Sequence, residues 1–248
     1  MLKLDECVII GGGHSIENGI RLGLRDSLVN KFVITCNYAF RHFDGSFLTF
    51  IDRDFYFPKP QNDGTLLNPN IYEELKGLPL IVGINHNGVS EFKLNNTILL
   101  QKSDTYQREK ALKNGFYTGS LTGIFSLTLA SFLMNYEGII YLSGFDWPRR
   151  DPKTVDRFNY SPNSDLNIHY YKKEIPHRGV GYVGMYENHN PENYFKYFKE
   201  KKLKIYNVSP ESNIETFEKI SYEKMFTSLN NETYNQEEIT TNIKQKLT

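Results

Sequence analysis

In the segment Val8-Ile9-Ile10-Gly11-Gly12-Gly13-His14-Ser15 an apolar strand runs directly into glycines and a serine. Glycines at such a turn let the backbone approach a ligand closely, and the helix that follows directs its amino end at an anion. The glycines, His14 and Ser15 are therefore candidates for contact with a phosphate. A turn that is rich in glycine for purely structural reasons is the alternative.

The complete dinucleotide fingerprint is absent, because Ile16 stands where that motif needs its last glycine. NAD is therefore not the favoured ligand. The next apolar strand, at 32–36, ends in Cys36 and is followed by Asn37, at the edge where open α/β sheets bind ligands. Asn37 is a candidate for reading a base or a sugar.

The composition limits the classes of protein. The chain has 248 residues, enough for one substantial core, and its 29 basic and 29 acidic side chains give a formal net charge of zero. We therefore expect no strong affinity for nucleic acid or an anionic membrane. Cys7 and Cys36 are the two cysteines, and their place beside apolar strands is typical of buried thiols in a reducing compartment. We expect a cytoplasmic protein, since no signal peptide precedes the first strand and no apolar run reaches the roughly 18 to 20 residues of a membrane span.

Apolar strands and amphipathic segments alternate along the chain, which predicts a mainly parallel sheet with helices on both faces. The predicted fold class is α/β and Rossmann-like. Expected strands lie near 7–11, 32–36, 47–51, 79–83, 97–100, 138–142 and 203–207, and expected helices near 16–28, 69–76, 118–135 and 191–201.

Two long segments, 52–68 and 146–190, lack apolar periodicity and leave the carboxyl edge of the expected sheet. Long loops in a compact domain are usually functional lids or disordered segments, and the excursion near 146–190 is the expected lid. We expect one transferase domain over 1–228. Residues 229–248 turn polar, which predicts a solvated C-terminal tail or a loosely docked terminal helix.

A pair of carboxylates, Asp52 and Asp54, follows the strand at 47–51. Side chains two residues apart on an extended chain lie on the same face, where they can hold a divalent metal ion against a diphosphate. The alternative is that Asp52 caps a turn while Asp54 pairs with Arg53 or Lys59 in solvent.

A second candidate anion site opens the expected helix at 118–135, at Thr118, Gly119 and Ser120. Thr118 or Ser120 is a natural N-cap, and the first amides of the helix are open to an anion. An ordinary helix cap is the alternative.

The turn Gly144-Phe145-Asp146-Trp147 follows the strand at 138–142 and reaches the same edge. Gly144 permits a sharp turn. Asp146 can accept hydrogen bonds from a ribose or polarise a nucleophile, and Trp147 can lie against a base or a sugar ring. Plain turn chemistry is the alternative.

Histidines are the natural acid–base candidates. His177 and His189 flank a glycine-containing segment of the expected lid, so either can swing over a bound substrate and take a hydroxyl proton near neutral pH. His14 can touch phosphate or replace the proline that often opens a helix after such a loop. Simple exposure in a loop is the alternative for all of them.

Several motifs, taken in order, resemble one superfamily. They are residues 11–15, Asn37, residues 118–120, the strand and turn 140–146, and residues 206–212. This pattern, over about residues 7–215, is similar to the single-domain, metal-independent bacterial sialyltransferases. It is also similar to the related Rossmann-like family that includes archaeal 6-hydroxymethylpterin pyrophosphokinase and flagellin glycosylation proteins.

In the sialyltransferases these motifs surround the cytidine nucleotide of the donor. The resemblance therefore implies nucleotide contacts by Gly12, Gly13, Ser15, Asn37, Ser120, Gly144, Phe145 and Asp146. Met185 stands where that family carries its base histidine. His177 or His189 can take this role only in a rearranged lid.

The resemblance implies a nucleotide-dependent transferase, foremost a glycosyltransferase that uses a nucleotide-activated sugar without a metal ion. Its expected partners are a nucleotide or nucleotide sugar and a small-molecule or glycan acceptor, and a homo-oligomer is left open. The pterin branch implies instead pyrophosphoryl transfer from ATP, with magnesium held by Asp52 and Asp54. A non-catalytic nucleotide-binding protein is the third alternative, and Met185 favours it.

Overall fold

The computed structural model describes residues 2–52, 59–60, 66–67, 70–85, 94–147 and 190–248. Within these residues eight strands form one sheet, in the order β12-β11-β10-β1-β2-β3-β6-β7, and neighbouring strands are parallel. The predicted α/β class with a mainly parallel sheet is confirmed. The strands of the sheet are β1 (Glu6–Ile10), β2 (Val33–Cys36), β3 (Phe47–Phe50), β6 (Ile81–Ile84), β7 (Thr97–Leu100), β10 (Gly138–Ser143), β11 (Leu203–Asn207) and β12 (Glu218–Lys219).

The direction of the strand order reverses in the middle of the sheet. From β1 the chain passes through β2, β3, β6 and β7 on one side, and later through β10, β11 and β12 on the other. All five residues of β1 are buried, because a central parallel strand is covered on both faces. The point between β1 and β10, at the carboxyl edge, is where open α/β sheets bind their ligands.

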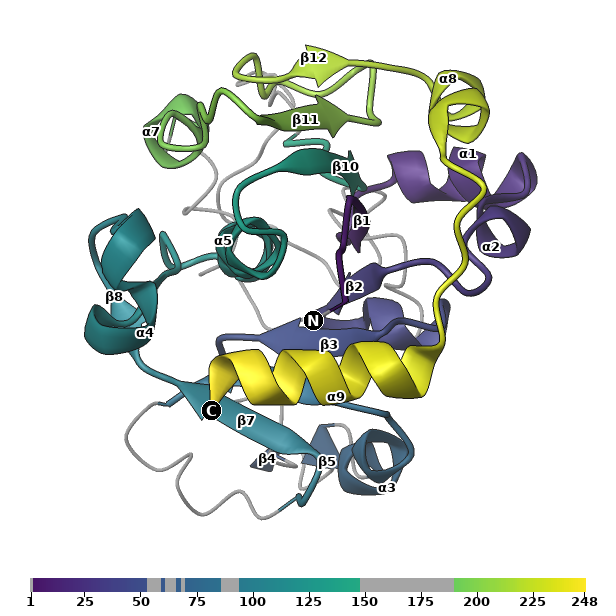
Figure 1. Cartoon of the computed structure of the whole chain (residues 1–248). Helices are drawn as coiled ribbons and strands as arrows, with labels where there is room; N and C mark the ends of the chain where they lie inside the picture. Colours follow the sequence, from purple (N-terminus) through teal and green to yellow (C-terminus); the bar gives the residue numbers. More distant parts are fainter. Residues whose placement is uncertain (1, 53–58, 61–65, 68–69, 86–93, 148–189) are drawn as a thin grey trace.

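Side chains of β1 alternate between two cores, as the pleat of a strand requires. Cys7 and Ile9 face the core of α5 (Thr122–Leu133) and α9 (Gln236–Leu247). Val8 and Ile10 face the core of α1 (Ser15–Arg21), α2 (Leu24–Ser27) and α8 (Tyr222–Ser228). Figure 1 shows the sheet between α5 on one side and α1, α2 and α8 on the other, so helices on both faces are confirmed.

The remaining elements are short. Helix α3 (Ile71–Lys76) packs in a third apolar cluster with β3 and β6. The others are η1 (Asn37–Arg41), η3 (Arg108–Lys110), α4 (Ala111–Asn114), α7 (Glu192–Phe195), and the strand pairs β4 (Lys59–Pro60) with β5 (Leu66–Leu67) and β8 (Lys102–Ser103) with β9 (Phe116–Tyr117).

Three expected helices differ from the prediction, and the one expected at 191–201 is only the four-residue α7. The segment at 16–28 is two helices, α1 and α2, because Gly23 between them has a φ of +96°. Helix α5 begins only at Thr122, since Gly119 and Ser120 have φ values of +51° and +61° and cannot belong to it. The predicted N-cap by Thr118 or Ser120 is wrong: Leu121 holds the N-cap position, and the Thr118 hydroxyl accepts a hydrogen bond from the Ser120 amide at 3.1 Å.

The terminal segment contains the helix α9. Its side chains Ile239, Ile243 and Leu247 recur every four residues, lie on one face, and are buried in the core with α5. Asn235 caps the helix by accepting hydrogen bonds from the amides of Glu237 and Glu238. Of the two outcomes that the sequence allowed, the docked helix is the one observed, while the domain boundary at 228 stays a prediction.

Cys7 and Cys36 are free and buried, as predicted. Much of the excursion at 52–68 lies outside the described residues, as does nearly all of the expected lid. Among the helices that the structure describes, none has the length and apolar character needed to cross a membrane.

Candidate functional site

The loop after β1 packs directly on the turn after β10. The Gly11 amide donates to the Ser143 carbonyl at 2.7 Å, and the Gly13 amide donates to the Gly144 carbonyl at 2.9 Å. A Cβ on Gly11 would lie 2.6 Å from the Gly144 carbonyl oxygen, and one on Gly13 would lie 2.5 Å from Oδ2 of Asp146. A larger residue would push the two segments apart, so this contact explains both glycines without a ligand.

The Asp146 carboxylate lies at the amino end of α1. Its Oδ2 accepts a hydrogen bond from the Ser15 amide at 2.8 Å, and its Oδ1 accepts one from the Ser209 hydroxyl at 2.7 Å. Because Ser209 gives its hydrogen to Asp146, the Ser15 hydroxyl is the donor in its 2.7 Å contact with Ser209. The negative charge is favourable at this helix end. Lone pairs remain on both carboxylate oxygens, so Asp146 can still accept from a ligand hydroxyl.

Tyr222 of α8 lies in the core that contains α1 and α2, and it supports this network from there. Its hydroxyl lies 2.7 Å from Oγ of Ser143, and a Cβ on Gly19 would lie 2.6 Å from its ring. Burial is the main cause that raises the pKa of Tyr222 to about 12, and the Asp146 charge adds to it, while hydrogen bonds with Ser143 and Ser15 act in the opposite direction. Tyr222 therefore remains a neutral hydrogen-bonding group at ordinary pH.

The turn after β10 is held by side chains of the segment after β11. The carbonyl oxygen of Phe145 accepts hydrogen bonds from Nδ2 of Asn207 at 3.1 Å and from the Ser212 hydroxyl at 2.7 Å. The Phe145 ring fills the space between the loop after β1 and α5, since a Cβ on Gly123 would lie 2.7 Å from it. Phe145 thereby contacts the loop after β1, the helix α5 and the segment after β11.

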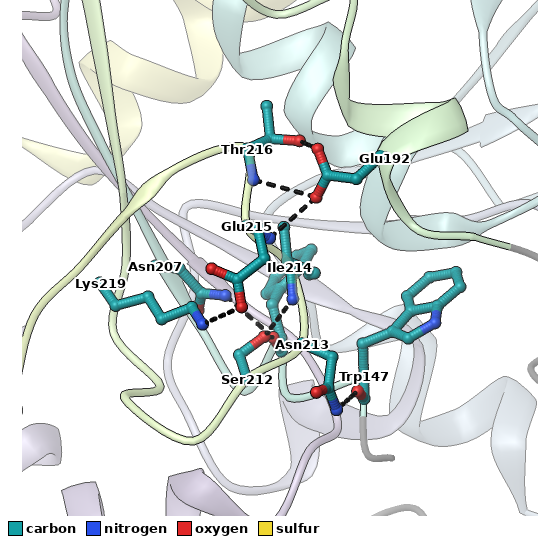
Figure 2. Close-up of polar contacts among 10 residues, drawn as sticks. Trp147, Glu192, Asn207, Ser212, Asn213, Ile214, Glu215, Thr216 and Lys219 are labelled. Carbon is teal, nitrogen blue, oxygen red and sulfur yellow. Dashed lines mark hydrogen bonds and ion pairs between the residues drawn. The ribbon is translucent and has the colours of Figure 1, made fainter. Parts of the chain in front are cut away.

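Asn213 fixes the next two residues of this turn, and Figure 2 shows its contact with Trp147. Its amide donates to the Asp146 carbonyl at 3.1 Å, and its side-chain Nδ2 donates to the Trp147 carbonyl at 2.7 Å. Trp147 has a φ of +42°, a backbone conformation that bulky residues rarely adopt. Strained backbone of this kind concentrates at functional sites.

Asn37 follows β2 and lies beside the amino end of α5. Its Oδ1 accepts a hydrogen bond from the Thr122 hydroxyl at 3.2 Å, so its Nδ2 hydrogens are the donors that it offers to a ligand. The N-cap residue Leu121 carries no capping oxygen, and the first amides of a helix lack intrahelical acceptors. Asn37 therefore places an amide donor beside a helix end that favours an anion.

Glu192, at the start of α7, is clamped by the loop between β11 and β12 (Figure 2). Its Oε1 accepts hydrogen bonds from the amides of Glu215 at 2.8 Å and Thr216 at 3.0 Å, and its Oε2 accepts one from the Thr216 hydroxyl. Two residues further on, Tyr194 lies over Gly119, where a Cβ would be 2.7 Å from the Tyr194 ring. These hydrogen bonds of Glu192 thus help to fix the Tyr194 ring next to the turn that precedes α5.

Of the other predicted side chains with acid–base or metal-binding chemistry, the structure describes His14 and Asp52. His14 is exposed, with Nδ1 3.5 Å from Oε1 of Glu17. Asp52 is half-buried after β3, whereas Asp54, His177 and His189 lie outside the described residues. Among the described residues, no group of three or more His, Cys, Asp or Glu side chains is placed to hold a metal ion.

The sequence indicates the loop after β1, the turn after β10 and Asn37 at one edge. Among the residues that hold them, Asn207, Ser209 and Ser212 belong to the motif 206–212 but had no predicted role. Ser209 and Asn213 had a signal, since polar residues follow β11 as they follow the other strands that end here. Glu192 and Tyr194 had none, because no local pattern around them indicates that they lie at this edge of the sheet.

The fold is similar to that of the MAf glycosyltransferase from Magnetospirillum magneticum AMB-1, with a TM-score of 0.54 and 14% sequence identity. The match covers 100% of this chain and 37% of that chain, so this chain spans little more than a third of that protein. No protein-family model and no curated protein sequence matches the chain. At this level of identity the similarity shows a shared α/β fold.

Proposed function

We propose that the chain is a nucleotide-dependent transferase, specifically a glycosyltransferase that holds an activated-sugar donor at the carboxyl edge near β1 and β10. The observation that carries the proposal is the contact between Asn37 and Thr122, which sets a side-chain amide beside the amino end of α5. An amide suits a base or ribose, and a helix amino end suits a phosphate. The activity of the MAf glycosyltransferase, which shares the fold, supports sugar transfer.

The geometry favours α5 over α1 for the donor phosphate. The Ser15 amide at the start of α1 is already bonded to the Asp146 carboxylate, which would repel a second anion. The first turn of α5 carries no acidic residue. In this proposal the exposed Ser120 faces the phosphate, and the buried Thr118, with Gly119, holds the turn that presents it. Asp146 accepts hydrogen bonds from donor hydroxyls through its remaining lone pairs.

Sugar transfer needs a base for the acceptor hydroxyl, and we assign that role to His177 or His189. The acceptor oxygen attacks the anomeric carbon, and the bond from that carbon to the nucleotide phosphate oxygen breaks. The hydroxyl proton passes to the histidine. The amides of α5 stabilise the charge that develops on the leaving phosphate, so the proposal requires no metal ion.

The first experiment is a thermal-shift panel of CMP, UDP, GDP, ADP and ATP, each with and without magnesium. A ligand at about a hundred times its dissociation constant adds roughly 2.7 kcal/mol to the free energy of unfolding. We expect one of the sugar-carrying nucleotides to raise the melting temperature without magnesium. A response confined to ATP with magnesium would favour pyrophosphoryl transfer, and no response to any nucleotide would contradict the proposal.

Turnover separates a transferase from a non-catalytic binding protein. The sugar donor of the nucleotide that binds is incubated with the full chain and a panel of sugar acceptors, with water as the acceptor in their absence, and release of that nucleotide is followed with time. Release above the rate without protein is the expected result. Binding without release would identify a nucleotide-binding protein that lacks the chemistry.

A further inference from the structure

Two aromatic rings meet beside the amino end of α5. The ring centroids of Trp147 and Tyr194 are 6.1 Å apart, with the planes inclined by 39°. Both side chains are half-buried. Phe195, which is fully buried, supports the indole from the core side at 6.4 Å, edge to face.

The backbone on both sides of this pair is fixed by one segment, residues 213–216. Asn213 holds the Trp147 carbonyl, and the amides of Glu215 and Thr216 hold the Glu192 carboxylate that precedes Tyr194. In Figure 2 the indole of Trp147 points away from the polar contacts that hold its backbone. The rings are therefore presented in set positions, which lowers the entropy lost when a ligand packs on them.

The amino end of α5 lies between Asn37 and this pair. Thr122 contacts Asn37 on the β2 side, whereas the neighbouring Gly123 packs on Phe145 on the β10 side. Tyr194 reaches the same helix end through its contact with Gly119. A ligand with its phosphate at α5 thus extends one half toward Asn37 and the other half toward the two rings.

We propose that Trp147 and Tyr194 form the binding surface for a pyranose ring, which rests on the proposed function and extends it. The ring of a sugar has a face of C–H groups that packs on aromatic rings. The half of the ligand that reaches Asn37 carries the base, whose edge requires hydrogen-bond donors. Glu192 is a positioning residue for Tyr194.

Trp147 is the only tryptophan of the chain, so its fluorescence reports on this surface directly. The full chain is titrated with CMP, UDP and GDP, with CMP-sialic acid, UDP-N-acetylglucosamine and GDP-mannose, and with the free sugars. We expect the nucleotide sugar that binds to change the Trp147 emission, and its nucleotide alone to bind with little change. A response to free sugar would place the acceptor sugar, rather than the donor sugar, on the rings.

Variants of Tyr194 distinguish a contact between its ring and the sugar from a purely structural role. Tyr194→Leu should weaken binding of the nucleotide sugar by about tenfold and leave the affinity for the nucleotide unchanged, while Tyr194→Phe keeps most of the affinity. Tyr197→Leu, a matched change at an exposed tyrosine of the same region, should change neither affinity. Thermal melting of each variant without ligand checks that it folds.

The outcomes distinguish this inference from the proposed function. If Tyr194→Leu weakens nucleotide and nucleotide sugar equally, or weakens neither, the pyranose surface is wrong while the nucleotide site stands. If no nucleotide, nucleotide sugar or free sugar changes either the melting temperature or the Trp147 emission, both proposals are overturned.

Discussion

The Oδ2 atom of Asp146 accepts a hydrogen bond of 2.8 Å from the backbone amide of Ser15, which lies 131 residues earlier in the chain. This contact joins the loop after β1 to the turn after β10 at the point where the strand order reverses. The same carboxylate is bonded to Ser209, after β11. Asp146 therefore has a structural role in addition to the ligand contact proposed for it.

Removing the Asp146 side chain should destabilise the protein. Asp146→Ala leaves the Ser15 amide and the Ser209 hydroxyl without their acceptor, which costs about 1–3 kcal/mol of the free energy of unfolding. Asp146→Asn should recover only part of this free energy, because its NH2 group faces one of the two donors and cannot accept a hydrogen bond from it. Urea denaturation measures both variants.

The control for this prediction is Asp104→Ala, at an aspartate whose side chain is 87% exposed and ion-paired with Lys102. Substitutions of exposed residues usually change stability by less than about 0.5 kcal/mol. Equal stability of Asp146→Ala and Asp104→Ala would show that the hydrogen bonds of Asp146 contribute nothing to folding.

The packing of the two segments predicts that any side chain at position 13 lowers the stability of the folded protein. A Cβ there would lie 2.5 Å from Oδ2 of Asp146, so Gly13→Ala should lower the free energy of unfolding by about 1–3 kcal/mol. Gly77→Ala is the matched control, because its Cβ would lie 3.5 Å from the Glu74 carbonyl oxygen, an ordinary contact. Urea denaturation again decides, and a Gly13→Ala variant as stable as Gly77→Ala would contradict the packing.

The central part of the fold could be predicted from the sequence because its strands are buried on both faces. Strands β1 and β10 read as apolar runs that end in glycine or serine, which fixes both their type and their end. Strand β12 carries only Glu218 and Lys219 at the edge of the sheet and has no apolar signal. The break at Gly23 was missed because a glycine inside an apolar pattern is compatible with a continuous helix.

The candidate site was predictable as separate pieces and not as a network. The position of Asn37 at the end of an apolar strand pointed to the carboxyl edge. The glycines suggested a phosphate loop, whereas in the structure Gly11 and Gly13 pack on the neighbouring turn. Such a contact depends on the strand order, which local sequence patterns do not determine.

The raised pKa of Tyr222 predicts a loss of stability at alkaline pH. Its pKa is about 12 in the folded protein against an ordinary value of 10, so the unfolded chain loses the phenol proton first. The free energy of unfolding therefore falls as the pH rises from 10 to about 12, and the contribution of the neutral phenol is complete below pH 10. Two pKa units correspond to about 2–3 kcal/mol.

Tyr222→Phe tests this dependence. The variant loses the hydrogen bond with Ser143, about 1 kcal/mol at pH 8, but it should lose less stability than the wild type between pH 10 and pH 12. The same change at the exposed Tyr197 is the control. Parallel stability curves for Tyr222→Phe and the wild type over this interval would show that Tyr222 is not the group responsible.

The buried cysteines predict an unreactive native protein. Burial raises the pKa of the Cys36 thiol to about 11 and that of the Cys7 thiol well above its usual range, and the thiolate is the reactive form. A colorimetric thiol reagent should find no reactive cysteine in the native chain and both after denaturation. Rapid reaction of the native protein would contradict the burial of Cys7 and Cys36.

The nucleotide site beside Asn37 is tested by calorimetric titration of Asn37→Gly and Asn30→Gly with the nucleotide that the thermal-shift panel selects. Both asparagines have positive φ, +49° and +58°, which glycine adopts freely, and they lie beyond opposite ends of β2. We predict that Asn37→Gly weakens binding by about tenfold and that Asn30→Gly binds like the wild type. Equal affinity of the two variants would contradict a nucleotide site beside Asn37 and the amino end of α5.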